Sequence, residues 1–442
     1  MTYQYTFKRL HNHMHAEKSM NILLLGSGGR EHALAWAITR SPLVNQLYVA
    51  PGNAGTAYIA QNVDLPMCDA SKIIEFCQRN AIDFVMIGPE TPLVAGMHDA
   101  LTEAGILSIG PSKAAAQLEG SKAFTKRICD SYHIPTAAYG KFTDAAEAKA
   151  YITQQGVPIV IKADGLAAGK GVVIARTFEE AYQAVDDMLL HHHFGDASSS
   201  IVVETFLEGE EVSFFVLSDG KTAIAFGSAQ DHKTAFDGDT GPNTGGMGTY
   251  SPAPVFTTKL QEQVMTDIIR PLLLGMEAEG MPYQGVLFAG LMLTRQGPIL
   301  LEINVRFGDP ETQVLMARLH SDLVPLLIAT ATGNLNRHRI QMDPHAAVCV
   351  VMATTGYPGD YVNGSTIYKL DQAAAADNTT IFHAGTVHGA HGEILANGGR
   401  VLGVTATGNT IKEAQKNAYS AVDAIEWPEG FCRRDIGWRA IA

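Results

Sequence analysis

The sequence has few of the features that mark membrane, secreted or nucleic-acid-binding proteins. No run approaches the roughly 18 consecutive apolar residues that a membrane span requires. The cysteines are odd in number and widely scattered, which argues against a disulfide framework or a zinc site; they are Cys68, Cys77, Cys129, Cys349 and Cys432. Acidic residues (45) outnumber basic ones (32), and a net charge of −13 repels a nucleic-acid backbone. We therefore expect a cytoplasmic protein with reduced thiols that binds neither membranes nor nucleic acids.

What the sequence does contain is typical of a large globular protein. It has 442 residues, of which 46% are hydrophobic and 17% charged, which suggests about three domains. Residues 1–19 lack the apolar centre of a signal peptide, and we expect them to be a disordered or artefactual leader. The pattern then predicts a parallel α/β domain over 20–121, an α+β domain over 122–334 and a small β-rich α+β domain over 335–442.

In the first domain, short apolar runs alternate with helical patterns. The runs 22–25, 47–50 and 84–87 each end in a glycine-containing turn. Strands that alternate with helices form a parallel sheet, and such sheets bind ligands at the carboxyl ends of their strands. The turns therefore predict a substrate site in this domain.

The first turn, Gly26 to Glu31, opens a helix directly after a strand. A dinucleotide fingerprint needs glycine at position 31 and an acid about 20 residues later, where this chain has Pro-Gly-Asn, so a nicotinamide dehydrogenase is disfavoured. Backbone N–H groups at the helix start, together with Arg30, would still suit a sugar phosphate. The alternative is that the glycines serve only strand-to-helix packing.

A second glycine-rich segment, Gly165 to Gly171, follows an apolar strand that ends near Lys162. It is not a Walker A loop, because the glycine spacing is one residue short, Gly171 replaces Ser or Thr, and a strand rather than a helix follows. A glycine loop between strands can instead cover a triphosphate, with Lys162 supplying a point charge. The alternative is a buried structural lysine paired with a carboxylate.

The sharpest candidate is the strand-like segment 299–306. Alternation along a strand places Glu302, Asn304 and Arg306 on one face, and Leu301, Ile303 and Val305 on the core face. Two oxygen ligands beside a guanidinium suit a divalent metal bound to phosphates and a developing phosphoryl charge. The alternative is a solvated strand face.

Three further segments complete the pattern. The apolar strand 202–207 runs into the acidic segment 208–211. Backbone groups there could hold an adenine edge. The alternative is that the segment is only a charged surface turn. A polar loop of unusual length is expected over 231–248, and loops that long are usually functional or mobile. The third domain shows few chemical groups, so we expect it to be structural.

These clusters, in this order, resemble the ATP-grasp superfamily and, within it, the glycinamide ribonucleotide synthetases of purine biosynthesis. The resemblance covers nearly the full length from Met20 and rests on long strings: GSGGREHALAW, APGNAGTA, GPSKAAAQLEGSKAFTK, IVIKADGLAAGKGV, DTGPNTGGMGTYSPAP, NVRFGDPETQ and CRRDIGWRAI. It implies a central ATP-grasp fold with a mobile lid over about 136–203. It also implies a ligase that uses ATP and Mg²⁺ or Mn²⁺ to join glycine to phosphoribosylamine through glycyl phosphate.

The resemblance also implies roles for individual residues. The implied ATP contacts are Lys122, Lys162, Gly165, Gly169, Lys170, Gly171, Glu204, Thr205, Leu207 and Glu211. Glu302 and Asn304 would hold the metal, and Arg306 with Lys162 would be catalytic. The implied substrate contacts are Gly28, Gly29, Arg30, Glu31, Asn53, Glu90, Asp231, His232, Lys233, Asn243, Thr244 and Arg306.

This sequence differs at one position from biotin-carboxylase-like members of the superfamily: it has Gly290 where those enzymes carry a second metal-binding glutamate. We expect small-molecule substrates only, and a monomer or a weak dimer. Two other readings stay open from the residues: another ATP-grasp ligase, such as a carboxylase, and a nucleotide-binding regulatory protein that kept the fold.

Overall fold

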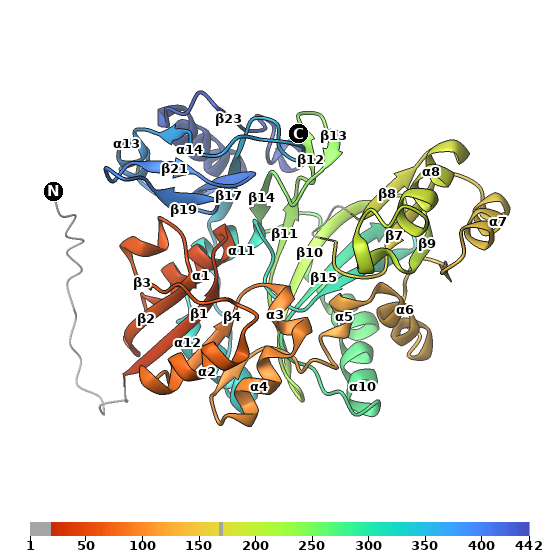
Figure 1. The fold of residues 1–442 in the computed structure, drawn as a ribbon, viewed down its shortest axis with the longest axis horizontal. Helices are drawn as coiled ribbons and strands as arrows, with labels where there is room; N and C mark the ends of the chain where they lie inside the picture. The colour runs from red at the N-terminus through yellow and green to blue at the C-terminus, as the bar shows by residue number, and fades with distance from the viewer. Residues whose placement is uncertain (1–18, 168–170, 442) are drawn as a thin grey trace.

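The computed structural model describes residues 19–167 and 171–441 (Figure 1). Nearly all of the expected leader, and the expected ATP contacts of Gly169 and Lys170, lie outside the described residues. All five cysteines are free thiols in the described part of the chain. No helix among the described residues is long and apolar enough to cross a bilayer.

The N-terminal domain contains a five-stranded sheet in the order β3-β2-β1-β4-β5, and its strands pair in parallel as the sequence predicted. Its strands are β1 (Met20–Gly26), β2 (Val44–Pro51), β3 (Gln61–Asn62), β4 (Phe84–Ile87) and β5 (Ser108–Ile109). Its helices are α1 (Gly29–Ile38), α2 (Ala70–Arg79), α3 (Glu90–Ala95) and α4 (Met97–Glu103). Helix α1 is buried along nearly its whole length, because the sheet lies on one side and later parts of the chain on the other.

A four-stranded lobe in the order β6-β9-β7-β8 projects to one side of the molecule, drawn in yellow in Figure 1. Its elements are β6 (Tyr139–Phe142), α7 (Ala145–Gln155), β7 (Ile159–Ala163), β8 (Val172–Ala175), α8 (Phe178–Leu189) and β9 (Ile201–Thr205). The lobe has a small hydrophobic core of its own, formed where α7 and α8 pack on the sheet. The short helices α5 (Gln117–Gly120) and α6 (Lys122–Ser131) lead into the lobe.

The largest sheet has nine strands and forms the centre of the molecule. Its first strands are β10 (Glu210–Asp219), β11 (Ala223–Asp231), β14 (Gly248–Ser251), β15 (Gln284–Thr294) and β16 (Gly297–Asn304). They are accompanied by α9 (Thr258–Val264), a π-helical turn (Met265–Ile269), α10 (Arg270–Ala278), α11 (Glu311–Arg318) and α12 (Leu323–Thr332).

The main strands of the third domain do not form a sheet of their own. Its strands β17 (Ala346–Thr354), β22 (Arg400–Gly408) and β19 (Thr379–His383) continue the central sheet, because β17 pairs with β14. A second sheet of β18 (Thr366–Ile367), β21 (Ile394–Ala396) and β20 (Thr386–His388) lies beside it. The remaining elements are α13 (Leu370–Ala374), α14 (Ile411–Ala424) and β23 (Gly430–Phe431).

Two local predictions were wrong. Leu301 does not point to the core: a bulge in the pairing of β15 with β16 inserts one residue, so that Leu300 and Ile303 are buried and Leu301 is half-buried. The segment 231–248 is not an unbroken loop, since it contains the hairpin β12 (Thr234–Phe236) and β13 (Thr240–Asn243).

Candidate active site

The carboxylate of Glu302 lies at the centre of a cluster of cations. Lys122 begins α6, Lys162 lies on β7 and Lys233 follows β11. Burial would raise the pKa of Glu302, but the charges of Lys233, Lys162 and Lys122 more than offset it and hold the pKa below its ordinary value. The alternative of a solvated strand face is therefore wrong, because the chain brings four separate segments together around one ionised carboxylate.

Lys162 is buried and ion-paired. Its Nζ lies 3.0 Å from a carboxylate oxygen of Glu204 and donates to the Leu301 carbonyl at 3.3 Å. Lys126, on α6, lies 3.2 Å from the same glutamate. The alternative is correct in that Lys162 is buried and paired with a carboxylate. The contact with the Leu301 carbonyl also places Lys162 beside the candidate metal ligands Glu302 and Asn304.

The start of α6 is tied to the glycine-rich loop. Lys122 Nζ donates to the Gly165 carbonyl at 3.1 Å. Asp164 accepts from the Ser121 hydroxyl at 2.9 Å and from the Ala123 N–H at 2.8 Å, so it caps the helix from the end of β7. Gly171 is buried at the other end of this loop.

The expected adenine edge follows β9. The Glu204 side chain is occupied by two lysines, and its backbone lies between Tyr139 of β6 and Val160 of β7 in the sheet. The Thr205 N–H donates to the Ala138 carbonyl at 2.9 Å, and Leu207 is half-buried just beyond the strand. Glu211, the expected ribose contact, is ion-paired with Lys233.

The Arg306 guanidinium donates hydrogen bonds to three side chains. Its Nε donates to Glu90 at 3.1 Å, and its Nη2 donates to Glu119 at 2.9 Å and to the Asn304 amide oxygen at 3.2 Å. Burial would lower the pKa of Arg306, but the charges of Glu119 and Glu90 raise it above its ordinary value. The guanidinium is thus permanently charged and fixed in direction.

The N-terminal turn is connected to Arg306 through a chain of charges. Arg30 Nη1 donates to the Phe307 carbonyl at 3.2 Å and lies 3.9 Å from Glu90. Glu31 turns back instead, accepting from the Gly28 N–H at 2.7 Å and from Arg30 Nε at 2.5 Å. Its carboxylate therefore holds the turn, whereas Arg30 and Glu90 lie toward the reaction centre.

Asn53 joins the turn to the third domain. Its amide nitrogen donates to the carbonyls of Ser27 and His383, each at 2.8 Å. Its side-chain oxygen accepts from the Gly55 N–H at 2.9 Å. The residue is buried, and both polar atoms of its amide have partners within the protein.

The residues from the 231–248 segment differ in position. His232 is fully buried, its Nε2 accepts from the Gly437 N–H at 3.1 Å, and burial lowers its pKa to about 4, so it anchors the segment as a neutral ring. Thr244 donates to the Lys233 carbonyl at 2.8 Å. The Asn243 side chain is exposed and makes no hydrogen bond within 19–167 and 171–441.

Two carboxylates interact near Arg306: Glu311, which is buried and close enough to affect the charge of Arg306, and Asp231, which is half-buried. Burial and the charge of Glu311 raise the pKa of Asp231 well above its ordinary value, while Glu311 accepts from the Ser213 hydroxyl at 3.0 Å. Two carboxylates that oppose each other's ionisation form a site that a cation stabilises.

Sequence reasoning missed several of these groups. Glu119 and Lys126 stand in a string that supports the resemblance, but the residues alone did not single them out. Asp309 and Glu311 lie three and five residues after Arg306, so their closeness in the sequence could have marked them as candidates for the same site. Arg400, from the third domain, had no such signal, although its guanidinium donates to the Asp309 carbonyl at 2.7 Å.

Comparison with known proteins agrees with this architecture. Models of the phosphoribosylglycinamide synthetase family match residues 20–119 (N domain), 120–312 (ATP-grasp domain) and 347–439 (C domain). The chain belongs to the phosphoribosylglycinamide synthetase family. It shares the ATP-grasp fold of that family and is an ATP-grasp ligase.

Relatives match over almost the whole chain. A phosphoribosylamine–glycine ligase of Agrobacterium fabrum is 57% identical, covering 96% of this chain and 99% of the relative. The chloroplastic ligase of Arabidopsis thaliana is 54% identical, covering 96% and 84%. The crystal structure of the Thermotoga maritima ligase has a TM-score of 0.82 at 33% identity, covering 94% of this chain and all of that one.

More distant structures share only the fold. The biotin carboxylase domain of a Hydrogenobacter thermophilus 2-oxoglutarate carboxylase, solved with MgADP and bicarbonate, has a TM-score of 0.74 at 17% identity, covering 94% of this chain and 92% of that one. In this chain Gly290 lies directly opposite Glu302 in the sheet, and a Cβ at position 290 would meet Glu302 Cγ at 3.0 Å.

Proposed function

We propose that this chain joins glycine to 5-phosphoribosylamine, releasing glycinamide ribonucleotide, ADP and phosphate, as a step of purine biosynthesis. The observation that carries the proposal is the convergence of Lys122, Lys162, Lys233 and Arg306 around Glu302. A carboxylate is a poor acyl donor, so ATP first phosphorylates glycine to glycyl phosphate. The amine then attacks the glycyl carbonyl and phosphate leaves.

The donor set fits a divalent metal. Glu302 and Asn304 offer a carboxylate and an amide oxygen two residues apart near the end of β16. Among the described residues, no group of three or more His, Cys, Asp or Glu could hold a metal. Mg²⁺ suits such a set, because it takes few protein ligands and completes its shell with phosphate oxygens and water. When bound, Mg²⁺ or Mn²⁺ would neutralise charge on the triphosphate.

The cations of the chain carry the rest of the electrostatic work. Negative charge develops on the transferring phosphoryl oxygens, and Lys162 with Arg306 would stabilise it from fixed positions. Both are held by carboxylates within 3.1 Å, so little reorganisation is needed when the reaction starts. Lys122 and residues 165–171 would contact the ATP phosphates.

The remaining expected residues fall into two substrate sites. Glu204, Thr205, Leu207 and Glu211 would bind adenosine, with the side chain of Glu204 acting through Lys162. Glycine would lie between Arg306 and the pair Asp231 and Glu311, with its ammonium group on the carboxylates. Acyl phosphates hydrolyse, so we propose that the lobe over about 136–203 closes as a lid to keep water out.

The phosphoribosylamine would approach from the N-terminal turn. Gly28, Gly29 and Arg30 lie on that side, with Glu90 between Arg30 and Arg306. Glu31, Asn53, His232 and Thr244 would position these groups rather than touch substrate. We further propose that the protein acts in the cytoplasm as a monomer or a weak dimer.

The test is a coupled assay of ADP release with single omissions. ADP release should require both glycine and phosphoribosylamine. Equal release with other amino acids would refute glycine as the substrate, release driven by bicarbonate would favour a carboxylase, and ATP binding without turnover would favour a regulatory protein.

A further inference from the structure

The C-terminal string CRRDIGWRAI, residues 432–441, lies against the hairpin of β12 and β13. Among the strands of the described chain, β12 and β13 pair only with each other. Every residue of β13 is exposed, and in β12 only Ala235 is buried. Because an isolated two-stranded hairpin is marginally stable in water, contacts from outside the hairpin must hold it in place.

We propose that the C-terminal segment 433–439 holds this hairpin and thereby positions Lys233 in the active site. Arg433 and Arg439 are positioning residues, which act through Asp239 rather than on a substrate. The proposal rests on the ligase activity proposed above, because Lys233 is one of the cations around Glu302. It gives the last residues of the third domain a part in the reaction.

Arg433 makes the largest number of contacts with the hairpin. Its side chain is fully buried, and all five of its N–H groups donate hydrogen bonds. Nη1 donates to the carbonyl of Thr234 at 3.2 Å and to its hydroxyl at 2.9 Å, and Nη2 donates to Asp239 at 2.9 Å. Nε and Nη2 also donate to the Asp435 carboxylate, each at 2.8 Å. A guanidinium whose donors are all used has none left for a ligand, so Arg433 holds the protein rather than a substrate.

The turn of the hairpin is bound through its backbone and side chains. The Gly238 N–H donates to the Asp435 carboxylate at 2.8 Å. The Asp237 carboxylate accepts from the Arg434 N–H at 2.7 Å. Both contacts join the turn to the same short stretch of the C-terminal segment, so they fix the direction in which the hairpin leaves the central sheet.

Asp239 connects the turn to two arginines at once. One of its carboxylate oxygens accepts from Arg433 at 2.9 Å and the other from Arg439 at 2.6 Å. Hydrogen bonds between ionised groups are stronger than neutral ones, so Asp239 carries much of the attachment. Its backbone has φ of +55°, a conformation in which Asp and Asn are more common than other residues with side chains.

Lys233 lies between two residues that the C-terminal segment holds. On one side, the Gly437 N–H donates to the buried His232 ring at 3.1 Å. On the other side, Arg433 donates to Thr234. The backbone of Lys233 is therefore fixed from both directions by the same part of the third domain.

The contacts of the segment also lead into the active site. The Lys233 ammonium group pairs with Glu211, and its charge lowers the pKa of Glu302. Arg439 Nη1 donates to the carbonyl of Asp231 at 3.4 Å, and Asp231 is the group proposed above for the ammonium of glycine. A loosened hairpin should therefore disturb the site for glycine and its phosphate.

The segment is itself attached to α14. The Tyr419 hydroxyl donates to the Arg433 carbonyl at 2.8 Å and accepts from the Ile436 N–H at 3.0 Å. Gln415 donates to the Ile436 carbonyl at 2.8 Å. Ile436 is buried in the core of the third domain, so the segment gives the hairpin a fixed support.

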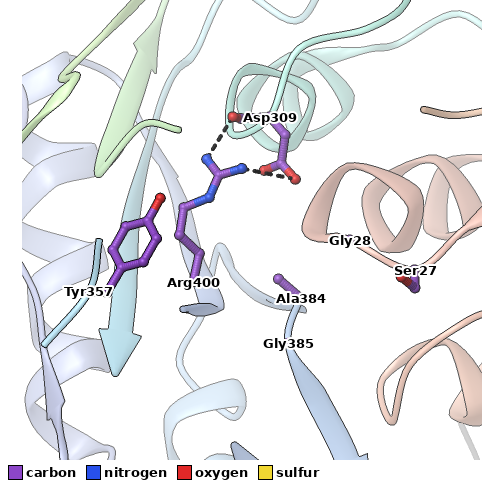
Figure 2. Close-up of a pocket in the computed structure, with 7 residues that line it drawn as sticks. All are labelled: Ser27, Gly28, Asp309, Tyr357, Ala384, Gly385 and Arg400. Atoms are coloured by element: carbon purple, nitrogen blue, oxygen red, sulfur yellow. Dashed lines mark hydrogen bonds and ion pairs between the residues drawn. The ribbon is translucent and has the colours of Figure 1, made fainter. Parts of the chain in front are cut away.

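The other end of the 231–248 segment is held by a different part of the third domain. Arg400 donates to the Gly246 carbonyl at 3.2 Å and to the Asp309 carbonyl at 2.7 Å, and Figure 2 shows its side chain extended to Asp309. This attachment uses no residue of 433–439. Loss of the hairpin contacts should thus loosen residues 234–243 without releasing the whole segment.

The test uses full-length variants at Asp239. Arg433 is a poorer choice, because its removal would leave Asp239 and Asp435 without their shared cation. Asp239→Asn keeps the side-chain size and suits the positive φ, but it removes the charge from both arginine contacts. Amide hydrogen exchange of residues 234–243 should become at least about 10-fold faster, the scale for weakening a hydrogen bond to a charged group. Exchange of β17 should stay unchanged.

The ligase assay then separates positioning from a loss of folded protein. Asp239→Asn should raise the KM for glycine several-fold and lower kcat, while the KM for phosphoribosylamine stays within about two-fold. A purely structural role would lower the amount of active enzyme, and with it the apparent kcat, at unchanged KM for glycine. Arg439→Gln should change the KM for glycine in the same direction. Combined with Asp239→Asn, it should add little, because both substitutions act on one contact.

Arg434→Gln is the matched control. Arg434 is the next arginine of the same string, but its side chain is half exposed and pairs with Asp423 on α14. The substitution should leave both hydrogen exchange and the KM for glycine unchanged. Unchanged exchange of 234–243 in Asp239→Asn, or faster exchange with an unchanged KM for glycine, would overturn the inference. A wild type without glycine-dependent ADP release would instead contradict the proposed function, and the exchange comparison would still decide whether the segment holds the hairpin.

Discussion

Removal of the Arg306 guanidinium should separate a catalytic defect from a stability defect. Arg306→Met keeps much of the side-chain volume but leaves Glu119 and Glu90 without their shared cation. The Glu119 side chain is 7% exposed and its ion-pair distance is 2.9 Å, so it becomes a buried, unpaired carboxylate. Breaking a buried pair from one side costs about 3–5 kcal/mol of the free energy of unfolding. Turnover should fall at least about 10²-fold, the scale for losing one preorganised charge stabiliser.

A second substitution distinguishes the two effects. In Arg306→Met with Glu119→Gln, the buried carboxylate is replaced by a neutral amide that can still accept from the Val305 N–H, which Glu119 binds at 2.7 Å. The double variant should therefore recover most of the lost stability in urea-induced unfolding, while ADP release remains at the level of the single variant. Recovery of turnover along with stability would show that Arg306 acts only through folding. Near-normal turnover in Arg306→Met would remove it from the catalytic residues.

Further outcomes follow from individual contacts. Glu302→Gln should raise the concentration of Mg²⁺ or Mn²⁺ needed for half-maximal activity at least about 10-fold, in a metal titration at fixed ATP; an unchanged titration would exclude it as a ligand. Burial raises the pKa of Glu119 to about 6 from an ordinary value of 4.5, so its stabilising protonated form is present below about pH 4.5 and is lost as pH rises through 6. The wild type should then lose about 2 kcal/mol relative to Glu119→Gln between about pH 4 and 7, and a constant difference would contradict the assignment. Gly246→Ala should cost at least about 1 kcal/mol in thermal unfolding and raise the KM for glycine, because Gly246 has φ of +109° and a Cβ there would meet Pro310 Cδ at 2.5 Å.

The parallel N-terminal sheet was predictable because its signals are local. Each strand is a short apolar run followed by a glycine turn, and the run 22–25 forms β1 with the expected parallel neighbours. The bulge at Leu301 was not predictable, because it arises from pairing with β15 and leaves no mark in the sequence of β16 itself.

The contacts of the candidate site also fall into those that are local in the sequence, which could be predicted, and those between distant residues, which could not. Glu302, Asn304 and Arg306 stand two apart in one segment, so their meeting could be inferred from strand alternation. Glu119 reaches Arg306 from 187 residues away and Arg400 reaches Asp309 from 91 residues away, so no local pattern links these partners. The continuation of the central sheet into the third domain depends in the same way on the distant pairing of β14 with β17.

The account as a whole requires that glycine be phosphorylated on its carboxylate before the amine attacks. Turnover with glycine labelled with ¹⁸O in the carboxylate tests this directly, since the bridging oxygen of glycyl phosphate leaves with the phosphate. We predict one ¹⁸O atom in each molecule of inorganic phosphate released, measured by mass spectrometry or ³¹P NMR. Phosphate without label, formed at the same rate as glycinamide ribonucleotide, would contradict the proposed mechanism.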